Sequence, residues 1–110
     1  MIRSKLPVLL LLALLPACST IRAWDGTQAT LRRQQAYQET APDQLYASGM
    51  QELRAGRHQR AVEIFDAIER EHPYSTWATN ARLMAAYSDY SRNRYTEAIG
   101  ALDRFIQLHP

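Results

Sequence analysis

The stretch GRHQRAVEIF, at residues 56–65, decides the fold because the chain repeats it. The second copy reads NRYTEAIGAL at residues 93–102, and a His-Pro pair follows each copy, at 72–73 and at 109–110. A shift of 37 residues brings alanine onto alanine, apolar residue onto apolar residue and proline onto proline. Self-similarity at a fixed period is the signature of a repeat architecture. The sequence therefore predicts two structural repeats.

Each repeat is predicted to contain two helices. Apolar residues in its second half are spaced by three and four, which places them on one helical face. They are Ala61, Val62, Phe65 and Ile68 in the first repeat, and Ala98, Ile99, Leu102 and Phe105 in the second. Gly56 and Asn93 stand between the two helices, and both residue types tolerate the positive φ that ends a helix. No segment alternates with a period of two, so we expect no strands.

The helix ends can be predicted from local signals, giving helices over 42–55, 59–71, 76–93 and 96–108. Proline and aspartate at 42–43 suit a first helical turn, and Ser75 suits an N-cap. The prolines at 73 and 110 end the second helix of each repeat, because the residue before a proline resists the α region. Small residues allow close helix approach, and they stand at Gly49, Ala61, Ala86 and Ala98.

The spacing resembles the tetratricopeptide repeat, whose basic length is about 34 residues. We therefore predict an all-α fold in which antiparallel helical hairpins stack as a solenoid, with 42–73 as the first repeat and 76–110 as the second. The alternative is a plain pair of similar hairpins. Two repeats are fewer than a solenoid usually needs, and the helix over 96–108 carries an uncovered apolar face. We expect either that the sequence is the amino-terminal part of a longer protein or that a partner covers this face.

Residues 1–17 resemble a lipoprotein signal peptide. A short basic head precedes an apolar run over 6–15, which is too short to span a bilayer. The ensuing LPAC, ending at Cys18, resembles the bacterial lipoprotein cleavage box, and Ser19 resembles the signal for transport to the outer membrane. The resemblance implies cleavage before Cys18 and covalent lipid, such as palmitate, on that residue. The alternative is a secreted protein with a free thiol. One cysteine cannot form an intrachain disulfide.

Residues 18–41 hold few apolar residues, so we expect a lipid-anchored flexible tether with room for a short helix near 29–38. Three alternatives stay open for Trp24: it rests at the membrane interface, it packs on the domain, or it is loose. The formal charge of +2 includes Arg3 and Lys5 of the leader, and the remaining side chains balance at eleven arginines and eleven acids. Nothing in this charge indicates nucleic-acid binding.

No catalytic or metal-binding constellation is recognisable in the sequence. His58, His72 and His109 are far apart, and two of them precede prolines at matching repeat positions. Zinc-protease, phosphate-loop and nucleophile-elbow motifs are missing. We therefore expect neither an enzyme, nor a metal, nor a cofactor other than the lipid on Cys18.

Helical repeats instead offer a groove for a peptide or another protein. In the tetratricopeptide family the first helix of each repeat lines this groove. Here two triplets at i, i+4 and i+7 belong either to the core between adjacent helices or to a binding groove. With Asn80 as a polar contact, the candidate groove residues are Tyr46, Met50, Leu53, Asn80, Leu83, Tyr87 and Tyr90.

One family resemblance is more specific. The junction HPYSTWA at 72–78, the LMAAY at 83–87 and the closing FIQLHP at 105–110 resemble the amino-terminal part of the BamD (ComL) family of lipoproteins. That resemblance implies a scaffold of the β-barrel assembly machinery, on the periplasmic face of the outer membrane. It implies binding to BamA, to other lipoproteins of the machinery and to unfolded outer-membrane β-barrel proteins.

Two other functions stay open. One is a different repeat lipoprotein, such as an adaptor in pilus assembly or cell division, although the 37-residue spacing argues against the usual 34. The other is the helical arm of an enzyme such as a lipoprotein lytic transglycosylase.

Overall fold

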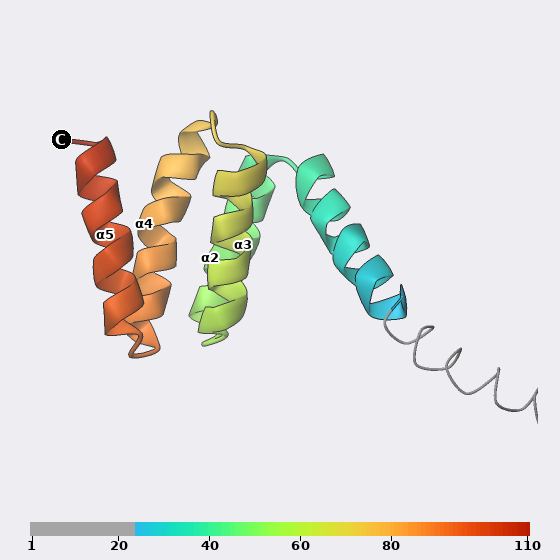
Figure 1. Cartoon of the computed structure of the whole chain (residues 1–110), viewed down its shortest axis with the longest axis horizontal. Helices are drawn as coiled ribbons and strands as arrows, with labels where there is room; N and C mark the ends of the chain where they lie inside the picture. Colours follow the sequence, from blue (N-terminus) through green and yellow to red (C-terminus); the bar gives the residue numbers. More distant parts are fainter. Residues whose placement is uncertain (1–23) are drawn as a thin grey trace, which may run out of the picture. The chain divides into compact units, whose positions relative to one another are not determined.

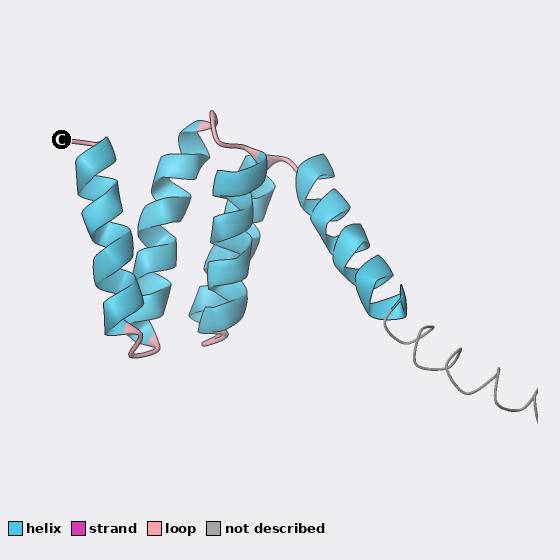
Figure 2. Cartoon of the chain, in the orientation of Figure 1, coloured by secondary structure: helices cyan, strands magenta, loops and turns pink. Residues whose placement is uncertain are grey.

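The computed structural model describes residues 24–110, and helices dominate this part of the chain. Four of them are α2 (Pro42–Arg54), α3 (His58–Glu71), α4 (Thr76–Ser91) and α5 (Tyr95–Leu108). Their bounds lie within two residues of those predicted. No strand occurs between residues 24 and 110 (Figure 2). The all-α prediction is therefore confirmed.

The four helices form two antiparallel hairpins, α2 with α3 and α4 with α5, which stack side by side (Figure 1). Helix α3 packs against both α2 and α4, and α2 also touches α4. This is the arrangement of a helical-repeat solenoid. It agrees with the resemblance to tetratricopeptide repeats.

The turns inside the two hairpins are built alike, as the repeat requires. Gly56 has φ +79° and Asn93 has φ +65°. In the first turn the Gly56 amide donates to the Leu53 carbonyl and the Arg57 amide to the Glu52 carbonyl. The second turn repeats both bonds 37 residues later. This pair of bonds is the Schellman ending of a helix, which needs a residue at positive φ.

The core lies where α3 meets its two neighbours. Phe65 and Ile68 are the largest apolar side chains that are fully buried, and Ala61, Ala67 and Ala81 are fully buried with them. Gly49, Ala86 and Ala98 are also buried, as predicted for small residues at close helix contacts. Interhelical contacts of this kind exclude water from apolar surface, which is the main force that stabilises the fold.

The amino-terminal signals of α2 and α4 fall where they were predicted. Pro42 opens α2 with Asp43 in its first turn, and Ser75 has the extended backbone of an N-cap. The Ser75 hydroxyl makes no capping hydrogen bond to α4. Its oxygen is buried and has no hydrogen-bond partner in the described part of the chain.

A further helix covers residues 24–39 and is longer than the short helix expected near 29–38 inside the tether. The chain divides between Gln35 and Ala36 into two compact units, and this helix crosses the boundary. Within the second unit, Tyr37 packs against the core, and the His72 Nε2–H donates to the Tyr37 carbonyl at 3.0 Å. The prediction covered ten of its sixteen residues and missed residues 24–28, which have almost no buried face. The predicted signal peptide and Cys18 lie outside the described residues.

Candidate functional site

An apolar groove lies on the last hairpin. It has a volume of about 450 Å³ and is walled almost entirely by carbon. Five residues of α4 and one of α5 line it: Leu83, Met84, Ala86, Tyr87, Tyr90 and Leu102. We call it the α4–α5 groove. Its large side chains are well exposed, with 54% of Tyr87 and 59% of Tyr90 accessible to water.

Three of the predicted groove residues, Leu83, Tyr87 and Tyr90, come together in this groove. They share one face because they stand at i, i+4 and i+7 on α4. Asn80 is exposed on the same helix but does not line the groove. Met84, Ala86 and Leu102 also line the groove but were not among the predicted residues. Leu102 could have been found, since it occupies the position of the buried Phe65 in the other repeat.

The first triplet lies in a different environment. Tyr46, Met50 and Leu53 are partly buried and pack against the core. The Tyr46 ring lies 5.6 Å from that of Phe65 and 5.0 Å from that of Trp77, measured between ring centroids. For this triplet, of the two interpretations that the sequence left open, packing in the core describes the structure better than lining a groove.

The repeat explains why the two triplets differ. A shift of 37 residues carries Tyr46 to Leu83, Met50 to Tyr87, Leu53 to Tyr90 and Phe65 to Leu102. In the first repeat this face packs on a core to which α4 contributes Ala78, Ala81 and Ala85. The α4–α5 groove is therefore the second-repeat copy of a face that already binds a helix. Its shape and chemistry suit an apolar helix or peptide.

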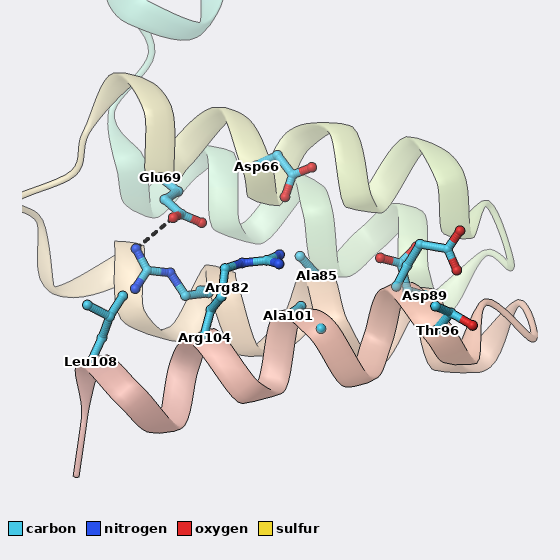
Figure 3. A pocket seen from close by; sticks show the side chains of 11 residues that line it. Asp66, Glu69, Arg82, Ala85, Asp89, Thr96, Ala101, Arg104 and Leu108 are labelled. Carbon is cyan, nitrogen blue, oxygen red and sulfur yellow. Dashed lines mark hydrogen bonds and ion pairs between the residues drawn. The ribbon is translucent and has the colours of Figure 1, made fainter.

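A second cavity, of about 470 Å³, is lined by charged side chains of α3, α4 and α5 (Figure 3). The Arg82 guanidinium donates to Glu69 at 2.6 Å across α4 and α3. Asp89 lines the cavity and accepts two bonds from Arg92, at 2.9 and 2.7 Å. Burial raises the pKa of the Asp66 carboxyl, and the neighbouring Glu69 and Asp89 raise it further. Four acids and two arginines line this cavity, and its Arg82–Glu69 pair joins α4 to α3.

The acids at equivalent positions 52 and 89 replace the large aromatic residue that tetratricopeptide repeats usually carry there. Glu52 forms an ion pair with Arg57, which follows the first turn, and Asp89 forms one with Arg92, the C-cap residue of α4. The hydrogen bond that the Arg57 guanidinium donates to Glu52 lowers the pKa of the Glu52 carboxyl. The Glu52–Arg57 pair therefore bridges the first turn, whereas the Asp89–Arg92 pair lies at the end of α4.

Nothing in the described residues forms a catalytic arrangement. Between residues 24 and 110 no three His, Cys, Asp or Glu side chains are grouped as a metal site. His72 binds a backbone carbonyl, and the His109 ring stacks on Phe105 at 4.7 Å between centroids. His58 is half-buried at the start of α3. In the same range no helix is long and apolar enough to cross a bilayer.

Comparison with known proteins identifies the family. A family model described as an outer membrane lipoprotein, YfiO, matches residues 38–110. An outer membrane protein assembly factor BamD of Caulobacter vibrioides is 45% identical over 74 residues, which are 67% of this chain and 24% of that protein. The BamD of Neisseria meningitidis serogroup B is 34% identical over 86 residues, 77% of this chain and 32% of the relative.

The chain thus spans about a quarter to a third of the length of these relatives. The match covers both repeats and the 72–78 junction. The chain therefore belongs to the outer membrane lipoprotein family that includes the BamD assembly factors.

Proposed function

We propose that this chain is the amino-terminal part of a non-catalytic scaffold of the β-barrel assembly machinery. The complete protein would help insert and fold β-barrel proteins in the outer membrane by binding unfolded substrates and partner subunits, BamA among them. Lipid on Cys18 would anchor it to the outer membrane, facing the periplasm. The names of its relatives, which are assembly factors, support this function over a pilus adaptor, a cell-division adaptor or the arm of a transglycosylase.

The observation that carries the proposal is the α4–α5 groove. A scaffold needs a surface that holds other polypeptides, and four large apolar side chains stand exposed here: Leu83, Tyr87, Tyr90 and Leu102. Contiguous exposed apolar surface of this kind marks a site that binds another polypeptide segment, either a further repeat of the complete protein or a different chain. The equivalent face of the first repeat packs against a helix through the same geometry, which supports an apolar helix or extended segment as the occupant.

Site-specific photo-crosslinking tests the groove. A photoreactive amino acid replaces Tyr87 in the complete protein, expressed in cells depleted of their own copy. The proposal expects adducts with BamA or with newly exported barrel proteins. The same probe at Asp103, an exposed position of α5 that does not line the groove, is the control. If Tyr87 forms adducts only within its own polypeptide, the groove serves the stacking of repeats and is not the client site.

Two further measurements test the function as a whole. Cells that depend on the complete protein should accumulate unfolded barrel proteins in the periplasm when it is depleted. Co-purification should retrieve BamA with it. Normal barrel assembly after depletion would overturn the proposed function whatever the crosslinks show.

A further inference from the structure

We propose that helix 24–39 lies along a phospholipid surface through Trp24 and Leu31. The inference rests on the proposed function, because it takes the membrane to be near through the lipid on Cys18. The family model begins at residue 38, so most of this helix lies outside the segment that identifies the family. The family match therefore says nothing about what this part of the helix contacts.

The first observation is the exposure of the helix. From Trp24 to Ala36 every residue is exposed except Gln28, which is half-buried. A helix of this length is only marginally stable alone in water, and Gly26 in its first turns weakens it further. A surface that accepts one of its faces would stabilise it.

The second observation is the arrangement of side chains around the helix. Trp24 and Leu31 are 61% and 51% exposed, and they are seven residues apart, so two turns place them on the same side. Gln28 and Gln35 stand between and beyond them on that side and carry no charge. At 100° per residue the charged side chains of the helix fall outside the arc that these four residues occupy, with Glu39 at its border and Asp25, Arg32 and Arg33 farther away. The helix therefore has one uncharged side with two apolar contacts.

The short distance along the chain from Cys18 to Trp24 favours lipid as the surface that this side of the helix contacts. Trp24 is six steps along the chain from Cys18, and an extended chain of six steps reaches about 20 Å. Lipid on Cys18 would hold Trp24 within that distance of the headgroups. Tryptophan prefers the membrane–water interface because its ring is apolar and its N–H is polar. A side with only two apolar residues among glutamines suits this half-polar zone, whereas a stable protein interface needs a larger apolar patch.

Tryptophan fluorescence tests the inference, because the chain has only two tryptophans. Trp77 is partly buried against the core, so the Trp77→Phe variant leaves Trp24 as the single reporter. The lipidated full chain is reconstituted into phosphatidylcholine vesicles with either ordinary or brominated acyl chains. We expect Trp24 emission to shift to shorter wavelength and to lose most of its intensity in brominated vesicles. The Trp24→Phe variant, which keeps Trp77, should be unaffected by bromine.

A charged substitution and a flotation assay complete the test. Leu31→Glu should restore the emission of Trp24 in brominated vesicles while the protein still floats with them. Protein that floats with an unquenched Trp24 at aqueous wavelength overturns the inference and leaves the lipid anchor standing. A Trp24 that is shielded from water yet unquenched assigns the helix to a protein surface, which also overturns it. Protein that fails to float overturns the anchor and the inference together.

Discussion

Gly49 of α2 lies directly against the ring of Phe65 of α3. A Cβ atom built on Gly49 would stand 2.6 Å from Phe65 Cε1 and 2.9 Å from Cζ. Phe65 is fully buried, so its ring has no free space to move into. The close approach of α2 and α3 therefore depends on the absence of a side chain at position 49.

Adding a side chain at Gly49 should destabilise the first hairpin. We expect Gly49→Ala to lower the free energy of unfolding by about 1–3 kcal/mol, and Gly49→Leu by at least as much, through overpacking. The control is Gly100→Ala on α5, where the added Cβ meets only Arg104 Nη1 at an ordinary 3.6 Å. There the better helix propensity of alanine should give a gain of about 0.5–1 kcal/mol. Urea unfolding measures both, and equal effects would contradict this account of the contact.

The hairpin turns make a second prediction. Asn93 has φ +65° where the first turn has glycine, and only a few residue types adopt this region without strain. Asn93→Gly should leave thermal stability unchanged or raise it slightly, whereas Asn93→Ala should cost about 1 kcal/mol. Gly56→Ala should show a similar loss, because its φ is also positive. If alanine at position 93 were as stable as glycine, the turn would not need the left-handed conformation.

These turns also explain why most of the fold could be predicted. A residue of positive φ, a proline and a stripe of small and apolar residues are local signals, and each recurs after 37 residues. Such signals fix helix ends to within two residues because they act through the backbone of the same few positions. The stacking of the hairpins follows from the second copy of the same stripe.

Other features depend on what surrounds a helix, and the sequence does not reveal that. Met50 and Tyr87 hold the same position in the two repeats, yet Met50 packs on the core while Tyr87 is exposed. The pattern alone could not separate these cases, because an apolar stripe looks the same whether or not another helix covers it. Residues 24–28 of helix 24–39 were missed for the opposite reason, since a segment with almost no buried face has no apolar stripe to recognise.

A third prediction concerns the charged cavity. Burial raises the pKa of Asp66 above its ordinary value of 3.8, and the acids Glu69 and Asp89 contribute to the rise. The folded chain therefore holds this proton more tightly than the unfolded chain. The stability that Asp66 contributes is complete below about pH 3.8 and is lost as the pH rises through the raised value.

Removing the charge should reverse this loss. Asp66→Asn should melt at a higher temperature than the parent chain near neutral pH, and the two should converge at about pH 3. Asp103→Asn is the matched control, because Asp103 holds the equivalent position in the second repeat, does not line the cavity and changes the net charge equally. Thermal melting as a function of pH measures the difference. A gain of the same size for both variants would assign it to net charge and not to the cavity.

The fourth prediction compares the two repeats at one position. Met50→Ala removes a side chain that packs against the core, so it should lower the free energy of unfolding by about 1–2 kcal/mol, less than for a fully buried methionine. Tyr87→Ala removes a side chain that is 54% exposed, and surface changes usually stay within about 0.5 kcal/mol.

The same two variants should behave oppositely in binding, since only Tyr87 lines the α4–α5 groove. Crosslinking from a neighbouring probe at Leu83 should fall in the complete protein carrying Tyr87→Ala and persist in the one carrying Met50→Ala. If Tyr87→Ala costs as much stability in the complete protein as Met50→Ala does, then Tyr87 belongs to the core there, and the groove is a joint between repeats and not a surface for other chains.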